Sequence, residues 1–239
     1  MASAFRFKQF QVRDQQSTMR VGTDAVLLGA WARPPENGSI LDIGTGCGVL
    51  ALMMAQKSKA EIIAIDIHQE SIQQAQENFR MSPWHNRLIA RHTGISEFSV
   101  SYQSKFNYII SNPPFFNNSL KPFSEGRILA RHMQPGFAED FVRSIHRLLE
   151  PDGKAALIVP PENYESIVPR FETHGIFPVR KAFVFSKPGS AMRRVMFEAA
   201  FNFTSLPVEE EILIMDENLA YSETYKNLTA GFYLFNNGG

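Results

Sequence analysis

Residues 41–48 read Leu41-Asp42-Ile43-Gly44-Thr45-Gly46-Cys47-Gly48, and this stretch decides the fold class. An apolar strand pattern leads into glycines at every second position, and a helical pattern follows at Val49–Gln56. Glycine lets the backbone pass close to a ligand, and the helix that follows presents free N–H groups to it. The dinucleotide-binding fingerprint has its last two glycines one residue further apart. The compact version here therefore favours a ligand that lacks a pyrophosphate.

An acidic residue follows the glycine turn at the spacing expected for a nucleoside site. The second apolar strand, Ala60–Ile65, runs into Asp66, which lies 18 residues after Gly48. A carboxylate at this place accepts the two hydroxyls of an adenosine ribose, so S-adenosylmethionine is the ligand that fits best. Asp42 either aligns the turn or meets the amino group of the ligand. The plainer alternative is a tight turn followed by a solvent-exposed strand end.

Short apolar runs alternate with helical patterns between residues 39 and 160. The expected strands are Ser39–Ile43, Ala60–Ile65, Arg87–Arg91, Phe106–Ser111 and Lys154–Val159, and the expected helices between them are Val49–Gln56, Gln69–Phe79 and Phe137–Leu149. Two further extended runs, Phe177–Phe185 and Arg194–Phe203, are joined by a Pro-Gly turn and predict an antiparallel hairpin at the sheet edge. The pattern predicts an α/β, three-layer, Rossmann-like fold with a mostly parallel seven-stranded sheet.

The composition fits one soluble domain of 239 residues. Apolar residues make up 44% of the chain, the formal net charge is zero, and the longest apolar run is too short to cross a bilayer. A single cysteine, Cys47, excludes an internal disulfide and fits a reducing compartment. We expect a basic, aromatic lead-in (1–38), a cofactor-binding core (39–160) and a substrate-side part (161–239). Within the lead-in, Thr23 or Asp24 is expected to cap a helix through Ala25–Trp31.

The stretch Ser111-Asn112-Pro113-Pro114-Phe115-Phe116 ends the fourth strand in an unusual way. An exocyclic purine amine is a poor nucleophile because its lone pair is delocalised into the ring. Two hydrogen-bond acceptors on its protons localise that pair, and Asn112 with the carbonyl of Pro113 can supply them. Pro114 stiffens the backbone, while Phe115 and Phe116 offer stacking surfaces. The alternative is an ordinary Pro-Pro loop with buried phenylalanines.

These motifs resemble those of class I S-adenosylmethionine-dependent methyltransferases of the Asn-Pro-Pro-Tyr/Phe group. The ends of the chain narrow the resemblance to the bacterial valine-tRNA adenine-37 N6-methyltransferases; the stretches that carry it are 7–10, 19–24, 27–31, 82–84, 221–223, 228–229 and 232–234. The resemblance covers nearly the whole chain. It implies a methyltransferase fold, methylation of the adenine beside the tRNA anticodon, a cytoplasmic location, no metal and no membrane. The oligomeric state stays open, with a monomer favoured.

Two departures from the family pattern leave alternatives open. Gly94 stands where an acid often contacts the cofactor adenine, and Phe115 stands where adenine-specific enzymes more often have tyrosine. The alternatives are guanine-N2 methylation of ribosomal RNA, glutamine-N5 methylation of a protein, and a nonenzymatic RNA-binding protein. The expected cofactor-binding residues are Thr23, Asp24, Asp42, Gly44, Thr45, Gly46, Gly48, Asp66, Ile67, Gly94, Ile95 and Asn112.

Basic residues gather around the predicted site although the chain as a whole is neutral. Together with aromatic side chains, they suit single-stranded anticodon-loop RNA with the target base flipped into the pocket. The expected RNA-binding residues are Phe115, Phe116, Arg127, Arg131, Lys187, Arg193, Arg194 and Lys8. For each cluster taken alone, the alternative is a solvated surface. The histidines show no metal-ligand spacing.

Overall fold

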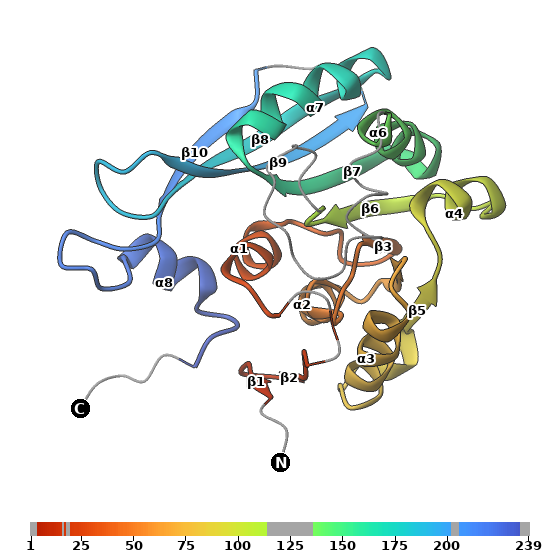
Figure 1. Ribbon diagram of the computed structural model, residues 1–239, viewed down its shortest axis with the longest axis horizontal. Helices are drawn as coiled ribbons and strands as arrows, with labels where there is room; N and C mark the ends of the chain where they lie inside the picture. Colours follow the sequence, from red (N-terminus) through yellow and green to blue (C-terminus); the bar gives the residue numbers. More distant parts are fainter. Residues whose placement is uncertain (1–3, 16, 18–19, 114–135, 202–205, 235–239) are drawn as a thin grey trace.

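An eight-stranded sheet forms the centre of the computed structural model, which describes residues 4–15, 17, 20–113, 136–201 and 206–234. The strand order is β10-β8-β9-β7-β6-β3-β4-β5 (Figure 1). The strands are β3 (Ser39–Ile43), β4 (Glu61–Asp66), β5 (Leu88–His92), β6 (Phe106–Ser111), β7 (Leu149–Val159), β8 (Ile176–Phe185), β9 (Met192–Phe201) and β10 (Val208–Leu213). β9 pairs antiparallel with β7 and β8, and the other pairs are parallel. The predicted mostly parallel α/β fold with an antiparallel hairpin is confirmed.

Two details of the predicted sheet are wrong. The sheet has eight strands instead of seven, and the hairpin β8–β9 does not form its edge, because β10 pairs in parallel with β8 beyond it. The sequence of β10 is Val-Glu-Glu-Glu-Ile-Leu, and its run of glutamates hides the strand pattern. The strand predicted at Lys154–Val159 begins earlier, since β7 starts at Leu149, with a bulge in its pairing to β6.

Helices cover both faces of the sheet and give three layers. On one face lie α1 (Thr23–Trp31), α2 (Val49–Lys57) and α3 (Gln69–Arg80); on the other lie α4 (Ile95–Ser101), α6 (Phe137–Leu148) and α7 (Pro161–Thr173). Alternate strand residues feed the two cores, so Ile40 packs with the first set and Leu41 with the second. α7 continues through Pro169. Among the described residues, none of the helices has the length and apolar character to span a membrane.

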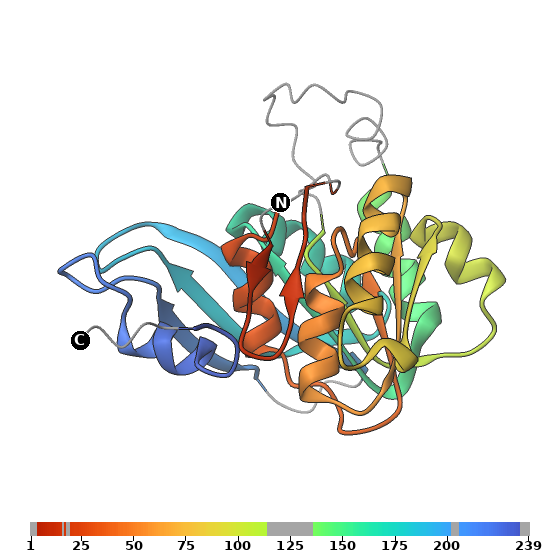
Figure 2. The same ribbon diagram turned by 90° about the horizontal axis from the view of Figure 1, so that it is seen from below.

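The lead-in and the last described residues pack together outside the first helical layer. A short hairpin of β1 (Phe5–Arg6) and β2 (Gln11–Val12) lies beside α1 and α2 (Figure 1; Figure 2), and α8 (Glu223–Thr229) packs against α1 and β10. The ring of Phe7 stacks on those of Phe10 and Tyr233, with centroids 4.5 and 6.0 Å apart. The Lys8 N–H donates to the Phe232 carbonyl over 2.8 Å. The lead-in and the aromatic tail therefore form one cluster.

The predicted cap of α1 is wrong. Gly22 occupies the N-cap position in extended backbone, and no side chain accepts a capping hydrogen bond there. Thr23 and Asp24 already belong to the helix. Asp24 instead accepts a hydrogen bond from the Nε of Arg194 over 2.8 Å. Its carboxylate therefore ties α1 to β9, and its negative charge in the first turn also interacts favourably with the helix dipole.

A buried ion pair joins the antiparallel strands to α1. Arg180 of β8 is 7% exposed and Glu198 of β9 is 1% exposed, and their charged groups lie 3.6 Å apart. The Tyr108 hydroxyl donates to Glu198 over 2.5 Å, and the Arg33 N–H donates to the same oxygen over 2.9 Å. The guanidinium of Arg180 lies 3.8 Å from the ring centre of Trp31. β8 and β9 are therefore fixed to the helical layer by charge as well as by apolar packing.

We expect Arg180→Met to lower the free energy of unfolding by about 3–5 kcal/mol, because it leaves Glu198 charged and buried without its cation. Urea unfolding measures the change. Adding Glu198→Gln, which keeps an acceptor for Tyr108 but removes the charge, should recover part of the loss. Arg143→Met is the matched control, since Arg143 pairs with exposed carboxylates, and it should cost about 0–1 kcal/mol. Equal losses in the two single variants would contradict the prediction.

Candidate active site

The carboxyl ends of three neighbouring strands bring together the main predicted site residues. Ile43 of β3 is in register with Ile65 of β4 and with Ser111 of β6. The residues that follow these three are Gly44, Asp66 and Asn112, so they form a row across adjacent strands, which lie about 5 Å apart. The chain runs from β3 towards β4 on one side, whereas β6 lies on the other side. The row therefore spans the topological switch point, where open α/β sheets bind their ligands.

Two glycines of the turn have left-handed backbone, but their surroundings differ. One is packed tightly against a helix, and the other borders open space. Gly48 has a φ of +86°, and a Cβ on it would lie 2.5 Å from the ring of Phe79. Gly44 has a φ of +71°, and a Cβ on it would meet no atom within 4 Å. The tight packing at Gly48 joins the turn to α3. The open space at Gly44 leaves its backbone accessible at the switch point.

Asp66 both holds the glycine turn and presents an acceptor beside it. Its Oδ2 accepts the Gly46 N–H and its Oδ1 accepts the His68 N–H, each over 2.9 Å. The side chain is half-buried, and each carboxylate oxygen has a second lone pair. Asp66 therefore keeps acceptor capacity for the ribose hydroxyls of a nucleoside.

The predicted adenine-side residues also lie close together. Ile67 follows Asp66, and its Cγ2 is 3.4 Å from the place where a Cβ on Gly94 would sit. The His92 ring lies 2.9 Å from the Ile67 carbonyl oxygen. Ile95 is buried in the core beneath α4. Gly94 thus gives a close, side-chain-free surface at the end of β5.

Asp42 anchors the turn and the first turn of α2 from inside the protein. It is fully buried, and its Oδ2 accepts the Thr45 hydroxyl over 2.6 Å and the Ala51 N–H over 3.1 Å. Ala51 lies at the third position of α2, so Asp42 satisfies one of the free N–H groups at the start of that helix. Its Oδ1 is buried and has no hydrogen-bond partner in the described part of the chain. Burial raises the pKa of Asp42 to about 7.

Asn112 presents an uncommitted carboxamide at the end of β6. The side chain is half-buried and makes no hydrogen bond to any residue that the structure describes. The neighbouring strand ends are tied together just before it, since the Ser111 hydroxyl donates to the Ile43 carbonyl over 2.8 Å. Pro113 is buried. Pro114, Phe115, Phe116, Arg127 and Arg131 lie outside the described residues, so their predicted roles remain predictions.

Several predicted RNA-binding cations have partners within the protein. The Lys8 ammonium donates to the Ala230 carbonyl over 2.7 Å, and Arg194 is paired with Asp24. Arg193 is exposed on β9, and its guanidinium lies 3.5 Å from the Ser186 hydroxyl. Lys187 is exposed in the turn between β8 and β9, and its ammonium makes no hydrogen bond or ion pair with a described residue. The tip of the hairpin therefore keeps two cations on its surface.

The sequence interpretation missed a buried amide that fastens the lead-in to the glycine turn. Asn78 of α3 is fully buried; its Oδ1 accepts the Arg13 N–H over 2.9 Å. Its Nδ2 donates to the carbonyls of Arg13 and Cys47, each over 2.8 Å. The sequence does contain a sign of this buried amide: Asn78 falls on the face of α3 that also carries Ala75 and Phe79. A polar residue on an apolar face requires internal partners.

The chemistry of the described residues offers neither a metal site nor a reactive thiol. Within the described ranges, no three His, Cys, Asp or Glu residues are grouped to hold a metal ion. Burial raises the pKa of Cys47 to about 12, so this side chain is a thiol at neutral pH. What the described residues do offer is the open backbone at Gly44, the carboxylate of Asp66 and the carboxamide of Asn112, which suit a nucleoside and a second hydrogen-bonding group beside it.

Comparison with known proteins identifies a family and its relatives. The family described as "Methyltransferase small domain" matches residues 17–170. The tRNA1(Val) (adenine(37)-N6)-methyltransferase of Parabacteroides distasonis is 39% identical over 96% of this chain and 97% of its own length. The protein of that name from Trichodesmium erythraeum is 36% identical over 96% of this chain and 97% of its own length.

Solved structures agree on the fold. A predicted O-methyltransferase from Agrobacterium tumefaciens superposes with a TM-score of 0.67 at 18% identity, covering 87% of this chain and 96% of its own. The tRNA m1G37 methyltransferase of M. jannaschii superposes with a TM-score of 0.61 at 14% identity, covering 84% of this chain and 57% of its own. At these identities the similarity shows the fold alone.

The chain belongs to the methyltransferase small domain family, as an S-adenosylmethionine-dependent methyltransferase related along nearly all of its length to the tRNA1(Val) (adenine(37)-N6)-methyltransferases.

Proposed function

We propose that this enzyme methylates the exocyclic N6 amine of an adenine in tRNA, at position 37 of tRNA1(Val). The observation that carries the proposal is the Asn112 carboxamide, which makes no hydrogen bond to a described residue and lies one strand away from the open backbone of Gly44. The names of the relatives support the choice of RNA and base, since those compared above are 36–39% identical over almost the whole chain. Action on tRNA would place the enzyme in the cytoplasm.

The proposed chemistry depends on acceptors and not on a strong base. The Asn112 side-chain oxygen and the Pro113 carbonyl accept the two amine protons, which turns the nitrogen lone pair out of conjugation with the ring. Bound S-adenosylmethionine supplies a methyl group activated by its sulfonium charge. Asp66 and the backbone at Gly44 hold its nucleoside and align it with Asn112, and alignment supplies most of the rate enhancement. The methylated nitrogen then releases one proton to solvent.

The remaining predicted residues complete the proposal. Gly46, Gly48, Thr45, Ile67, Gly94 and Ile95 shape the cofactor side, with Thr23 and Asp24 at its margin. Phe115 and Phe116 stack on the target base, while Pro114 fixes the backbone that carries them. Arg127, Arg131, Lys187 and Arg193 contact RNA phosphates. Lys8 adds positive charge beside its contact to the Ala230 carbonyl, whereas the charge of Arg194 is offset by its ion pair with Asp24.

Incubation of the enzyme with labelled S-adenosylmethionine and unmodified total tRNA should give N6-methyladenosine, identified by mass spectrometry of the digested RNA. The label should map to position 37 of tRNA1(Val), and a transcript with guanine at that position should stay unlabelled. N2-methylguanosine as the product, or label in protein alone, would overturn the proposed function and favour one of the two rival methyltransferase activities.

Asn112→Ala should lower kcat by roughly 100-fold or more, because one of the two acceptors on the amine is lost at the moment of transfer. The dissociation constant for S-adenosylmethionine, measured by calorimetry, should change less than about twofold. Asn107→Ala is a matched control at the opposite end of β6, where Asn107 accepts the Ser39 N–H. It should lower stability and keep kcat. Full activity of Asn112→Ala would disprove the role of this carboxamide.

The affinity for S-adenosylmethionine should rise with pH between about pH 6 and pH 8. The pKa of Asp42 in the free enzyme is about 7, and a cationic ligand on the adjoining turn favours the carboxylate, so binding releases a proton. A change of one pKa unit corresponds to about tenfold in affinity. Asp42→Asn keeps an acceptor for Thr45 and Ala51 but does not titrate. The ratio of the wild-type to the Asp42→Asn affinity at each pH therefore gives the part of the pH dependence that comes from Asp42. Parallel pH profiles for the two proteins would exclude Asp42 as the source.

A further inference from the structure

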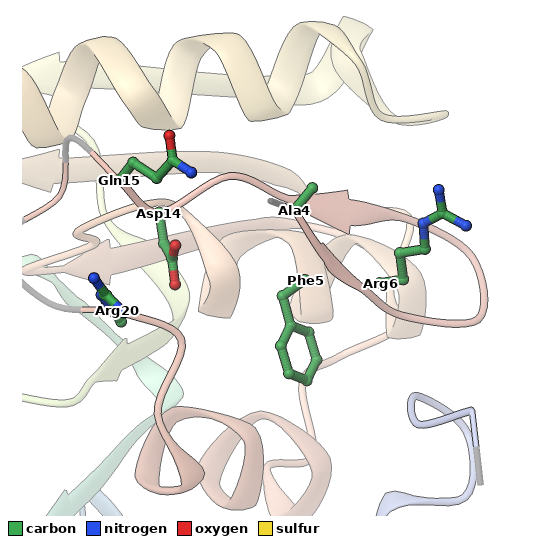
Figure 3. A pocket seen from close by; sticks show the side chains of 6 residues that line it. All are labelled: Ala4, Phe5, Arg6, Asp14, Gln15 and Arg20. Atoms are coloured by element: carbon green, nitrogen blue, oxygen red, sulfur yellow. The ribbon is translucent and has the colours of Figure 1, made fainter. Parts of the chain in front are cut away.

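A polar pocket opens within the lead-in, apart from the row of strand ends. The pocket has a volume of about 580 Å³, within the range of small-molecule sites. Residues from two separate stretches of the lead-in line it. The lining residues are Ala4, Phe5, Arg6, Asp14, Gln15 and Arg20 (Figure 3). None of them belongs to the predicted cofactor site. The pocket therefore needs an explanation of its own.

The lining combines one aromatic ring with two uncommitted guanidinium groups. Phe5 is 39% exposed; in Figure 3 Arg20 lies across the pocket from its ring, while the Arg6 side chain leaves the same strand in another direction. Arg6 and Arg20 are exposed and form no ion pair with any residue in the described part of the chain. An exposed ring is a platform for a base, and guanidinium groups bind phosphate. The set fits one nucleotide of a single strand, with its flanking phosphates.

The platform is held rigidly from behind. The ring centre of Phe5 lies 4.9 Å from that of Phe7 and 5.9 Å from that of Tyr233. Across the pocket, the Asp14 Oδ2 accepts the Val21 N–H over 2.9 Å and closes the lead-in into a loop. These contacts fix the position of the ring before any ligand arrives, which lowers the entropy cost of stacking a base on it. The other carboxylate oxygen of Asp14 can accept the amine of that base.

The pocket also lies near the glycine turn. Asn78 holds Arg13 to the Cys47 carbonyl, and the Ser17 hydroxyl lies 3.2 Å from the place where a Cβ on Gly46 would sit. Gln15, which lines the pocket, is two residues from Ser17, and two residues of chain span at most about 7 Å. The lead-in that lines this pocket is therefore fastened to the glycine turn, whose strand β3 pairs with β6, the strand that precedes Asn112.

We propose that this pocket binds a nucleotide next to the methylated base, with its base stacked on Phe5 and its phosphates contacted by Arg6 and Arg20. The inference rests on the proposed action on RNA and deepens it, because it gives the substrate strand a second fixed point. The site selects single-stranded RNA, since bases within a duplex are not free to stack on a protein ring.

The test compares variants of the full-length enzyme on the unmodified tRNA1(Val) transcript, by fluorescence anisotropy and by steady-state kinetics. Phe5→Ala should weaken RNA binding roughly tenfold or more, whereas Phe5→Trp, which keeps a stacking surface, should bind within about threefold of the wild type. The Arg6→Ala/Arg20→Ala double variant should lower the slope of log Kd against log salt by about 0.7 for each lost phosphate contact. All variants should raise KM for tRNA more than they lower kcat.

Matched controls separate the pocket from general effects of charge or folding. Arg147→Ala removes an equally exposed arginine from α6 on the opposite face, and it should leave the affinity for RNA and the salt slope unchanged. The dissociation constant for S-adenosylmethionine should stay within about twofold in every variant, which confirms an intact glycine turn. The methylated nucleoside formed by the wild type is identified in the same preparation.

The outcomes separate this inference from the proposed function. If the wild type methylates tRNA while Phe5→Ala and the double arginine variant bind it normally, the pocket proposal is overturned and the function stands. Loss of RNA affinity by Phe5→Ala and Phe5→Trp alike, with an unchanged salt slope in the double variant, also overturns the pocket. A wild type that neither binds nor methylates tRNA would overturn both.

Discussion

The end of β4 holds the backbone of the glycine turn, and the site depends on this contact. The N–H groups of Gly44 and Thr45 both donate to the Ile65 carbonyl, over 2.9 and 3.0 Å, and the Gly46 N–H donates to the Asp66 carboxylate. Three successive N–H groups are thereby fixed on one neighbouring strand. A Cβ on Gly44 would meet no atom of a described residue within 4 Å. β4 thus satisfies the N–H groups of the turn, while β6 and Asn112 lie on the other side of β3.

The same turn is also where the ends of the chain are secured. Asn78 hydrogen-bonds the carbonyls of Cys47 and Arg13 with one amide group, so the lead-in lies over the turn. The lead-in is in turn packed against the tail through Phe7 and Tyr233. A change in either end should reach the cofactor turn through this chain of contacts. A protein of zero net charge can thus bring local positive groups to its site, because the fold places the lead-in there.

The sequence predicts the elements whose burial is uniform and misses those that depend on distant partners. β3, β4 and β6 are apolar runs buried on both faces, and the glycines and Asp66 follow them directly, so strand order and site row could both be inferred. β10 could not, because its glutamates resemble a solvated segment until Arg180 is known to pair with Glu210 over 2.7 Å. Nor does local sequence show that a guanidinium from β9 engages Asp24, so the polar residues at the start of α1 are predicted to cap it.

Two buried side chains near the carboxyl edge of the sheet have polar atoms without a hydrogen-bond partner. Among the described residues, the buried side-chain atoms without a partner are Asp42 Oδ1, both amide atoms of Asn163 and, at the other end of α2, Gln56 Oε1. Asn163 lies in the first turn of α7, just beyond the carboxyl end of β7, and Asn112 follows β6, its neighbour. Each unpaired buried polar group costs about 1–3 kcal/mol. Asp42 and Asn163 therefore leave donor and acceptor capacity near this edge of the sheet, and a group that pairs with these atoms on binding would recover that free energy.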